Sequence, residues 1–173
     1  MHLHTLGPEP AGARLGDWME VWFAAFSGPP YHVRPSALPL IEATFLSHLG
    51  EPGFRLVFAE EGGRVLGFAY GFFRRPGQPW VEEVAQALGP RARLLEGAFG
   101  FVEIAVHPDH QRKGVGSALH DRLLRGVKAP RAVLTVHERA PALGFYLRRG
   151  WRPLGALVEA PYLVLAKPLQ DQA

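Results

Sequence analysis

The sequence predicts a mixed α/β (α+β) fold, in which helices cover both faces of a central sheet. Segments with strand-like and helix-like patterns alternate along the 173 residues. Residues 54–75 show the pattern of a β-hairpin, and residues 98–127 show a strand, a glycine loop and a helix in succession. The resulting order, β-α-α-β-β-β-α-β-α-β-β, implies a mixed sheet.

The first part of the chain contains one short predicted strand and two predicted helices. The strand covers residues 2–6. Residues 16–28 have apolar side chains at helical spacing and end at Gly28, and residues 36–50 form a helix that a serine opens and a glycine closes.

The hairpin at 54–75 has the clearest local signal. Two β-rich runs flank Glu61-Gly62-Gly63, and glycine supplies the positive φ that a tight turn needs. Residues 80–88 then look helical until Gly89-Pro90 interrupts them, and 91–97 predict one more helical turn. The remaining predicted elements are a strand at 98–107, a helix from about Gly114 to 127, a strand at 131–137, a helix at 140–150, and strands at 151–158 and 162–169.

Composition excludes several classes of protein. The hydrophobic fraction of 47% and the charged fraction of 20% are ordinary for a globular chain, and the length suits one domain over residues 1–173. No apolar run is long enough to span a membrane, and the N-terminus lacks the pattern of a secretory signal. With no cysteine in the chain, we expect a cytoplasmic protein without disulfides or thiolate-bound zinc.

Positive charge concentrates around one loop. The net charge is only +3, yet residues 110–128 contain five lysines and arginines against the single acid Asp121. A nucleic-acid-binding protein would carry a wider basic surface. A small polyanionic ligand therefore explains the charge better, and we expect neither a nucleic acid nor a membrane as a partner.

The loop itself reads "QRKGVG", the pattern Q-x-x-G-x-G from Gln111 to Gly116. It does not match a Walker A loop, and Leu119 stands where a Rossmann fingerprint needs a third small residue. Glycines at 114 and 116 let the main chain approach a phosphate closely. The N–H groups and positive dipole of the helix that follows then face the anion.

At these residues the chain resembles the GCN5-related N-acetyltransferase (GNAT) superfamily. The stretch "IAVHPDHQRKGVGSALHDRLL" is similar to the acetyl-CoA-binding segment of that family. About 30 residues later, "APALGFYLRRGW" matches its second signature, A-x-x-[FL]-Y-x-x-x-G-[FW]. The resemblance covers roughly residues 98–152, and the N-terminal half agrees in element order alone.

The resemblance implies a mostly antiparallel sheet with a V-shaped splay between the fourth and fifth strands. It also implies an enzyme that transfers the acetyl group of acetyl-CoA, its cosubstrate, to a primary amine of a small molecule or protein. The alternative is a non-catalytic module of the same fold that binds or senses acyl-CoA. The expected partners are acetyl-CoA and an amine acceptor, with a homodimer as an option, and no metal is expected.

The resemblance also implies a set of residues that contact acetyl-CoA. Backbone amides near Val106 would meet the pantetheine arm or the thioester carbonyl, and the loop would hold the pyrophosphate. Arg139 stands where the family often has an asparagine, so a phosphate contact is the role left for it. The implied set is Ile104, Ala105, Val106, Gln111, Arg112, Lys113, Gly114, Val115, Gly116, Ser117, Arg139 and Tyr146.

Two residues are candidates for proton transfer. Tyr146 occupies the tyrosine of the second signature, which implies that it protonates the leaving thiolate; core packing is its other interpretation. Glu103, on the strand before the loop, is the first candidate for the general base, because a buried carboxylate needs a task or a partner. The alternative for Glu103 is a salt bridge at a strand end. His107 and His137 are further candidates for a proton relay or for loop structure.

The acceptor is the least defined part of the prediction. In the family the first two helices, their loop and the segment before the fourth strand build the acceptor site. Those segments supply aromatic side chains that either hold a cation or pack the core, and Glu82-Glu83 is the one adjacent acidic pair of 76–97. The aromatic and histidine candidates are Trp18, Trp22, Phe26, Tyr31, His32 and Trp80.

Overall fold

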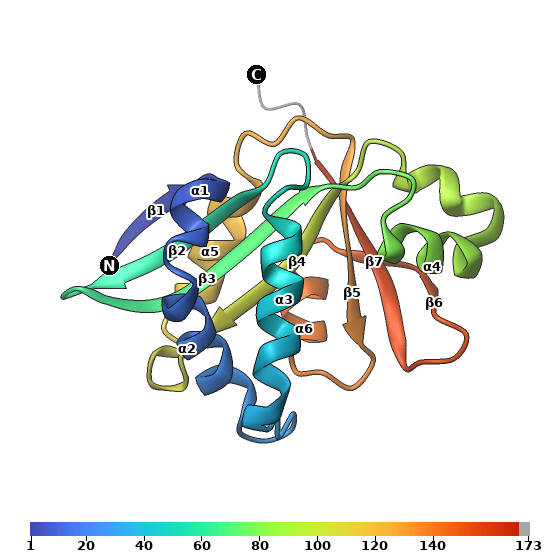
Figure 1. Ribbon diagram of the computed structural model, residues 1–173. Helices are drawn as coiled ribbons and strands as arrows, with labels where there is room; N and C mark the ends of the chain where they lie inside the picture. Colours follow the sequence, from blue (N-terminus) through green and yellow to red (C-terminus); the bar gives the residue numbers. More distant parts are fainter. Residues whose placement is uncertain (170–173) are drawn as a thin grey trace. The chain divides into compact units, whose positions relative to one another are not determined.

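The computed structural model describes residues 1–169, and its elements alternate as the sequence predicts (Figure 1). The strands are β1 (His2–Leu6), β2 (Arg55–Glu61), β3 (Arg64–Phe73), β4 (Phe99–Val106), β5 (Arg131–His137), β6 (Arg152–Ala156) and β7 (Tyr162–Pro168). The α-helices are α1 (Pro8–Gly12), α2 (Leu15–Phe26), α3 (Leu38–His48), α4 (Pro79–Leu88), α5 (Val115–Leu124) and α6 (Ala142–Arg148). Three 3-10 helices complete the set: η1 (Pro35–Ala37), η2 (Gly89–Leu95) and η3 (Pro108–His110).

The strands form one seven-stranded sheet in the order β1-β2-β3-β4-β5-β7-β6. The pairs β1–β2, β2–β3, β5–β7 and β6–β7 are antiparallel, whereas β4 and β5 are parallel. The predicted mixed, mostly antiparallel fold is therefore confirmed. No helix within residues 1–169 is long and apolar enough to cross a membrane.

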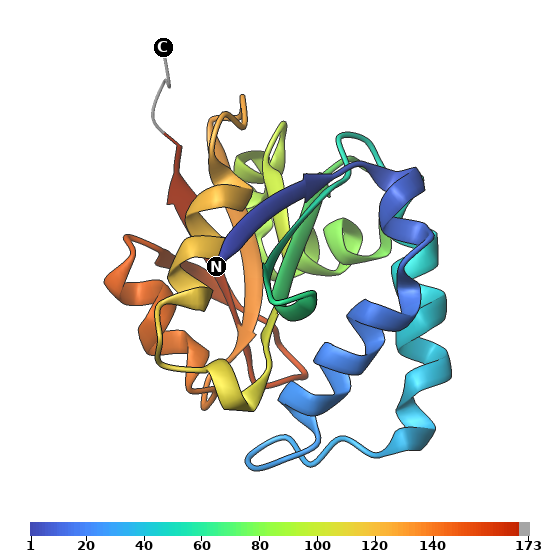
Figure 2. The ribbon, with the colours of Figure 1, turned by 90° about the vertical axis from the view of Figure 1, so that its left-hand side faces the viewer.

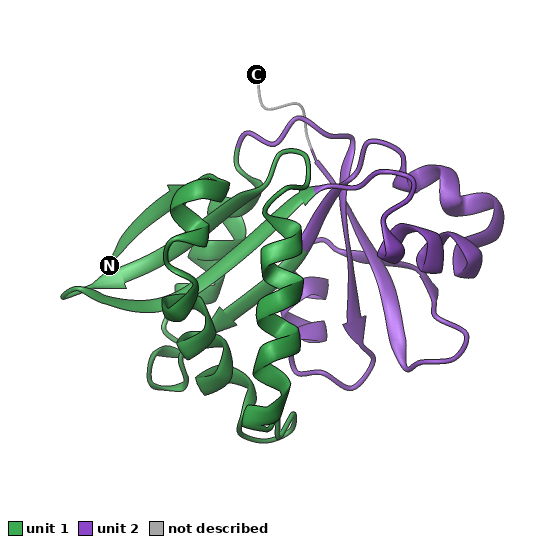
Figure 3. Ribbon diagram, in the orientation of Figure 1, with its two compact units in different colours: residues 1–72, 102–125 green, residues 73–101, 126–173 purple. Residues whose placement is uncertain are grey.

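The chain divides into two compact units (Figure 3). The first unit contains residues 1–72 and 102–125, and the second contains residues 73–101 and the described residues from 126 on. The boundary falls inside β3 and inside β4, so the last five residues of β4 belong to the first unit.

In the first unit, α2 and α3 lie on one side of the strands and α5 lies on the other (Figure 2). Alternate side chains of a strand point to opposite faces, so one set of β2 and β3 residues meets α2 and α3. This core is aromatic. Helix α5 packs closely on the opposite face, where a Cβ at Gly67 would lie 3.1 Å from the Leu119 side chain of α5 and 2.8 Å from the Ala105 carbonyl oxygen of the neighbouring strand β4. The fully buried aromatic residues of the core include Trp18, Phe45, Phe58, Phe68 and Phe72.

In the second unit, β5 pairs with β7 along its whole length, and β6 extends the sheet. Helix α4 packs beside these strands through Val81, Val84 and Leu88. The parallel ladder between β4 and β5 contains only the pairs Phe99 with Ala132 and Gly100 with Val133. It ends there although both strands continue, as expected for the predicted splay.

The predicted elements differ from the observed ones mainly at their ends. The five residues of α1 were not predicted, because one turn is too short to show a helical period. The helix predicted at 36–50 begins as the 3-10 turn η1, and its α-helical part runs over Leu38–His48. The hairpin turn lies where the sequence places it, with φ of 58° at Gly62 and 77° at Gly63.

Candidate active site

Hydrogen bonds fix the loop that follows β4, residues 107–114, to the neighbouring strands. The His107 backbone N–H donates to the Leu66 carbonyl at 2.8 Å, and the Gln111 side-chain amide donates to the Val106 carbonyl at 3.0 Å. The His107 Nδ1 accepts from the Asp109 backbone N–H at 3.2 Å, which stabilises the turn η3. Two of the predicted residues, Gln111 and His107, thus have a structural task in shaping this loop.

The last part of the loop leads into α5 through left-handed backbone. Arg112 has φ of 61° and Gly114, the N-cap of α5, has φ of 84°. No side chain caps this helix, and Arg112, Lys113 and Gly114 are exposed. Because the first amides of a helix lack intrahelical acceptors, the N–H groups at Val115 and Gly116 suit an anion. Backbone donors and positive charge thus lie together at the start of α5.

The opposite end of α5 is held by Arg55 of β2. Its guanidinium donates to the carbonyls of Arg122 at 3.2 Å and Arg125 at 3.1 Å, the C-terminal carbonyls of the helix. Burial and, to a smaller extent, the charge of Arg122 lower the pKa of Arg55. These bonds fix the direction of α5, and so the direction in which its first turn points.

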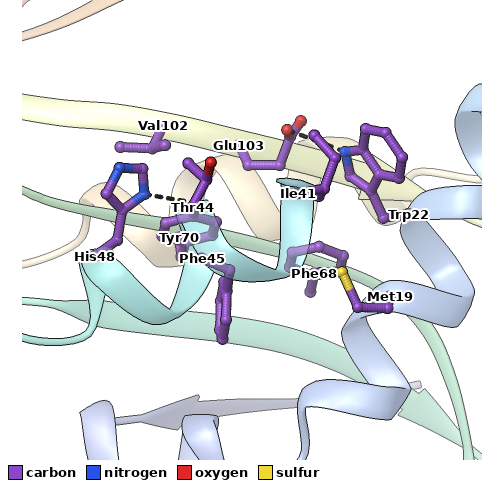
Figure 4. A pocket seen from close by; sticks show the side chains of 10 residues that line it. All are labelled: Met19, Trp22, Ile41, Thr44, Phe45, His48, Phe68, Tyr70, Val102 and Glu103. Carbon is purple, nitrogen blue, oxygen red and sulfur yellow. Dashed lines mark hydrogen bonds between the residues drawn. The ribbon is translucent and has the colours of Figure 1, made fainter. Parts of the chain in front are cut away.

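On the other side of the same strands, the first unit contains a pocket of about 110 Å³ (Figure 4). It lies between α2, α3 and the strands β3 and β4, and most of its wall is aromatic or aliphatic. Glu103 is the only carboxylate among the residues that line it. We call this the Glu103 pocket; its lining consists of Met19, Trp22, Ile41, Thr44, Phe45, His48, Phe68, Tyr70, Val102 and Glu103.

Two N–H groups hold the Glu103 carboxylate. The Trp22 indole Nε1 donates to Oε2 at 3.2 Å, and the Ile104 backbone N–H donates to Oε1 at 3.2 Å. Burial raises the pKa of Glu103 from 4.5 to about 7, although the Trp22 and Ile104 hydrogen bonds act in the opposite direction. Desolvation thus outweighs both hydrogen bonds, and the carboxyl changes charge near neutral pH.

No lysine, arginine or histidine within residues 1–169 forms an ion pair with Glu103. The structure therefore gives no support to the interpretation of Glu103 as a strand-end salt bridge. A carboxylate offers about four acceptor positions, and the two donors use only part of this capacity. Glu103 can still accept a proton or contact an ammonium group.

A hydrogen-bonded pair lies elsewhere in the pocket wall. The His48 Nδ1 and the Tyr70 hydroxyl are 2.9 Å apart, and the Tyr70 ring also packs edge-on against Phe45 (Figure 4). The sequence did not indicate a role for His48, Tyr70 or Thr44. The spacing of Ile41, Thr44 and His48, three and four residues apart, would have placed them on one face of α3. It could not have shown that this face lines a pocket.

In the second unit, Tyr146 is buried, with 6% of its surface exposed. Its ring packs edge-on against Phe101 at 5.8 Å and Phe145 at 5.4 Å, and against Trp151 at 5.7 Å. We call these four residues the Tyr146 cluster. The packing interpretation of Tyr146 is thus present in the structure, and it does not compete with a role for the hydroxyl.

The other candidates of the second unit have local partners. His137 Nδ1 accepts from the backbone N–H of the exposed Arg139 at 3.0 Å, so it shapes the loop after β5. Thr135, on β5, accepts from the Trp80 indole at 3.2 Å. The Arg74 guanidinium lies over the Trp80 ring, 4.1 Å from its centroid. Both contacts of Trp80 are therefore packing contacts inside the second unit.

The aromatic acceptor candidates separate into two groups. Trp22 lines the Glu103 pocket, whereas Trp18 is fully buried and donates its indole N–H to the Ala11 carbonyl at 2.8 Å. Glu82 accepts from the Gly77 backbone N–H at 2.8 Å and so supports the start of α4. In residues 1–169 no three histidine, aspartate or glutamate side chains gather as they would around a metal ion.

The early end of the β4–β5 ladder and the glycine loop that opens α5 match the fold that the two sequence signatures implied. The sequence agrees: residues 16–151 match the model of the "Acetyltransferase (GNAT) family". The match covers most of the chain and includes residues of both units. The chain therefore belongs to the GNAT acetyltransferase family, as the two signatures indicated.

Relatives and solved structures agree with this assignment. The chain is 28% identical over 165 residues to the GCN5-like protein acetyltransferase Rv2170 of Mycobacterium tuberculosis, covering 79% of this chain and 78% of the relative. Its fold matches that of an aminoglycoside 6'-acetyltransferase type Ii with a TM-score of 0.69 at 13% identity, over the whole of both chains. It also matches yncA, a putative acetyltransferase from Salmonella typhimurium solved with acetyl-CoA, with a TM-score of 0.62 at 17% identity over 100% and 96% of the two chains.

Proposed function

We propose that this protein transfers the acetyl group of acetyl-CoA to a primary amine, with Glu103 as the general base. One observation carries the proposal: a carboxyl group with a pKa of about 7 faces a pocket and has no cationic partner within residues 1–169. It lies on the strand that leads directly into the glycine loop. Glu103 and Val106 are three residues apart, about 10 Å along an extended strand.

The loop would hold the phosphates of acetyl-CoA. The amides at Val115 and Gly116 open α5, and the exposed Arg112 and Lys113 come directly before them. A pyrophosphate at a helix N-terminus is stabilised by the N–H groups and the helix dipole together. The support from neighbours is that yncA, of the same fold, was solved with acetyl-CoA.

Glu103 would remove a proton from the ammonium group of the acceptor, so that the amine nitrogen can attack the thioester carbon. An alkylammonium has no lone pair, so the amine must be deprotonated before it forms a bond to the thioester carbon. A base whose pKa lies near the working pH is efficient, because it is partly ionised yet still binds a proton. Glu103 meets this condition because burial has raised its pKa to about 7. The proton passes from nitrogen to the Glu103 carboxylate and then to solvent.

The second proton step is assigned to Tyr146. As the C–N bond forms and the C–S bond breaks, the sulfur leaves as a thiolate, which the Tyr146 hydroxyl protonates before regaining a proton from solvent. The nitrogen loses its second proton, so the net products are an amide, the free thiol of CoA and one proton. This assignment rests on the signature that Tyr146 occupies, A-x-x-[FL]-Y-x-x-x-G-[FW].

The proposal is tested by incubating the protein with acetyl-CoA and a panel of primary amines. Thiol release should depend on the amine, and mass spectrometry should find the acetyl group on nitrogen. Transfer to hydroxyl compounds with none to amines would contradict the proposed N-specificity. Binding of CoA without transfer to any acceptor would instead favour the non-catalytic acyl-CoA module.

CoA binding has a separate test at the loop. Ligand binding to the folded state stabilises it by mass action, so CoA should raise Tm. Gly116→Val places a branched side chain on the second residue of α5 and should abolish that shift. Gly16→Val is the matched control, because Gly16 is the exposed second residue of α2 with open space around it. An equal Tm shift in both variants would show that close backbone approach at Gly116 is not needed.

A further inference from the structure

The size of the Glu103 pocket restricts what can enter it. Its volume of about 110 Å³ is comparable with the ~150 Å³ cavity that admits one benzene ring. Pockets for drug-sized ligands are several times larger, about 300–1,000 Å³. The pocket therefore suits one compact group.

The chemistry of the wall restricts the group further. The rings of Trp22, Phe45, Phe68 and Tyr70 contribute to it, together with the aliphatic Ile41 and Val102. The His48 Nδ1 and the Tyr70 hydroxyl form a hydrogen bond of 2.9 Å with each other. Most of the wall consequently favours an apolar group over a polar one.

Negative charge occurs at a single point of the wall. Glu103 is its only carboxylate, and the Trp22 indole N–H donates to Oε2 at 3.2 Å. A carboxylate in a mostly apolar wall attracts one ammonium group through a charge-assisted hydrogen bond. A second ammonium group in the same pocket would have no carboxylate, and an unpaired buried charge is strongly unfavourable.

We infer that the acceptor is a monoamine in which one primary amino group is attached to a compact apolar body, about the size of a phenyl ring or a branched four-carbon chain. This inference rests on the proposed function, since it assigns the acceptor to the Glu103 pocket. The amino group lies at Glu103 and the apolar body contacts the face of α3. Polyamines and polycationic sugars are excluded as good acceptors.

Helix α3 then determines specificity. Ile41, Thr44 and His48 recur at three- and four-residue spacing, so one face of α3 forms one wall of the pocket. Thr44 is exposed at the rim, where its hydroxyl donates to the Leu40 carbonyl at 2.9 Å. Its neighbour Ala43 is exposed on the same helix but does not line the pocket. The pair allows a matched comparison.

The first experiment compares acceptors at saturating acetyl-CoA. We expect kcat/KM for 2-phenylethylamine and 3-methylbutylamine to exceed that for spermidine by roughly 100-fold or more, since a hydrophobic pocket discriminates against an added polar group by about that factor. Phenylalaninamide and a tripeptide that begins with phenylalanine carry the same amine and ring. The rates of acetylation of these two compounds, compared with that of 2-phenylethylamine, show whether the acceptor is a free amine or the N-terminal residue of a peptide.

The second experiment uses the matched pair. Thr44→Phe should narrow the pocket and lower kcat/KM for 2-phenylethylamine by about tenfold or more, with the KM for acetyl-CoA within about twofold of wild type. Ala43→Phe should leave both constants nearly unchanged. Ethylamine, which needs little space, should lose much less in Thr44→Phe than 2-phenylethylamine does. Equal losses for the two amines would overturn the assignment of the apolar body to this pocket.

The outcomes separate this inference from the proposed function. Faster acetylation of spermidine than of either apolar monoamine overturns the inference and leaves amine acetylation standing. If no amine is acetylated, the proposed function is wrong. The inference is then tested by the binding of 2-phenylethylamine, measured as a shift in Tm. A Tm rise with 2-phenylethylamine in wild type and in Ala43→Phe but not in Thr44→Phe supports the assigned ligand class. No rise in wild type overturns it.

Discussion

The Glu103 pocket in the first unit and the Tyr146 cluster in the second unit are made of similar side chains. Each surrounds one proton-transfer candidate with aromatic rings. In the pocket the rings leave about 110 Å³ beside the carboxyl group, which burial holds at a pKa of about 7. In the cluster the rings of Phe101, Phe145 and Trp151 all lie within 6 Å of the Tyr146 ring, and Tyr146 is 6% exposed.

The difference shows how to separate a chemical role from a structural one. Removing the Tyr146 ring would leave a hole in a core, so its burial is already explained by packing. Burial of the Glu103 carboxylate has no such explanation, because a charged group beside an apolar pocket destabilises the fold. Substitutions that preserve shape but change protonation therefore test the two regions in the same way.

The largest expected effect is on turnover in Glu103→Gln. The amide keeps the shape of the side chain but cannot take a proton, so kcat/KM should fall by roughly 10²- to 10⁴-fold, the usual contribution of a general base. Wild-type kcat/KM should rise with pH through an apparent pKa of about 7, and the variant should lack that step. Steady-state rates from pH 5.5 to 9 at saturating acetyl-CoA measure both.

The control for that experiment is Glu42→Gln. Glu42 lies on α3 and does not line the pocket, so Glu42→Gln tests the loss of one carboxylate outside the pocket. Wild-type rates and a wild-type pH profile are expected for it. If Glu103→Gln keeps wild-type rates and a wild-type pH profile, as expected for Glu42→Gln, Glu103 is not the general base. The Glu103 pocket and the Tyr146 cluster would then not differ in a proton-transfer role.

The next effect is that of Tyr146→Phe. The ring and its three aromatic contacts remain, so Tm and CoA affinity should change little. Loss of the hydroxyl should lower kcat by roughly tenfold to ten-thousandfold if Tyr146 protonates the thiolate. Measurement at saturating acetyl-CoA across pH separates a lost acid from a binding defect. Wild-type turnover would assign Tyr146 to packing alone, and the thiolate would then be protonated by water or another group.

The sequence predicted best the features that depend on neighbours along the chain. The hairpin turn at Gly62 and Gly63 and the loop that opens α5 are determined by local backbone geometry, so short motifs reveal them. Glu103 was identified because a carboxylate on a central strand is costly to bury, which is a property of one residue in one element. The two signatures supplied the family.

The pocket itself was beyond the sequence. It requires α3 to approach β3 and β4 at a particular distance, and side chains as far apart in the sequence as Met19 and Glu103 to leave a void between them. His48 and Tyr70 are 22 residues apart and their hydrogen bond has no local sequence signal. Trp18 and Trp22 look alike in the pattern of α2, yet one fills the core and the other holds Glu103. Packing between elements decides such differences.

A third effect concerns stability and its dependence on pH. The pKa of Glu103 is higher in the folded chain, about 7, than its ordinary value of 4.5. Below pH 4.5 the group is protonated in both states and causes no penalty. As pH rises toward 7 the unfolded chain releases the proton first, so the folded state loses stability relative to it. The difference of about 2.5 pKa units corresponds to at most about 3 kcal/mol.

Glu103→Gln should therefore be more stable than wild type at pH 8, with an advantage that shrinks as the pH falls from 7 to 4.5. Urea unfolding of both proteins at several pH values measures the difference in free energy of unfolding. A constant difference over this range would mean that the Glu103 carboxyl is not desolvated in the folded state. Tyr146→Phe removes no carboxyl group, so its difference from wild type in free energy of unfolding should not change between pH 4.5 and 7. This variant therefore serves as the comparison.

The smallest expected effect comes from the one side-chain hydrogen bond to Glu103. The Trp22 indole donates to the carboxylate at 3.2 Å and lowers the pKa of Glu103, against the larger effect of burial. Trp22→Phe keeps an aromatic ring in the wall but removes the donor, so the pKa should move above 7 and the rise of kcat/KM should shift to higher pH. Met19→Leu, which changes another residue of the wall without a hydrogen bond to Glu103, should leave the midpoint in place. A midpoint that moves down in Trp22→Phe, or equally in both variants, would show that the shape of the pocket, and not the indole hydrogen bond, sets the protonation of Glu103. A shift in Trp22→Phe alone would show that a single donor in the pocket wall adjusts the pH at which this acetyltransferase works.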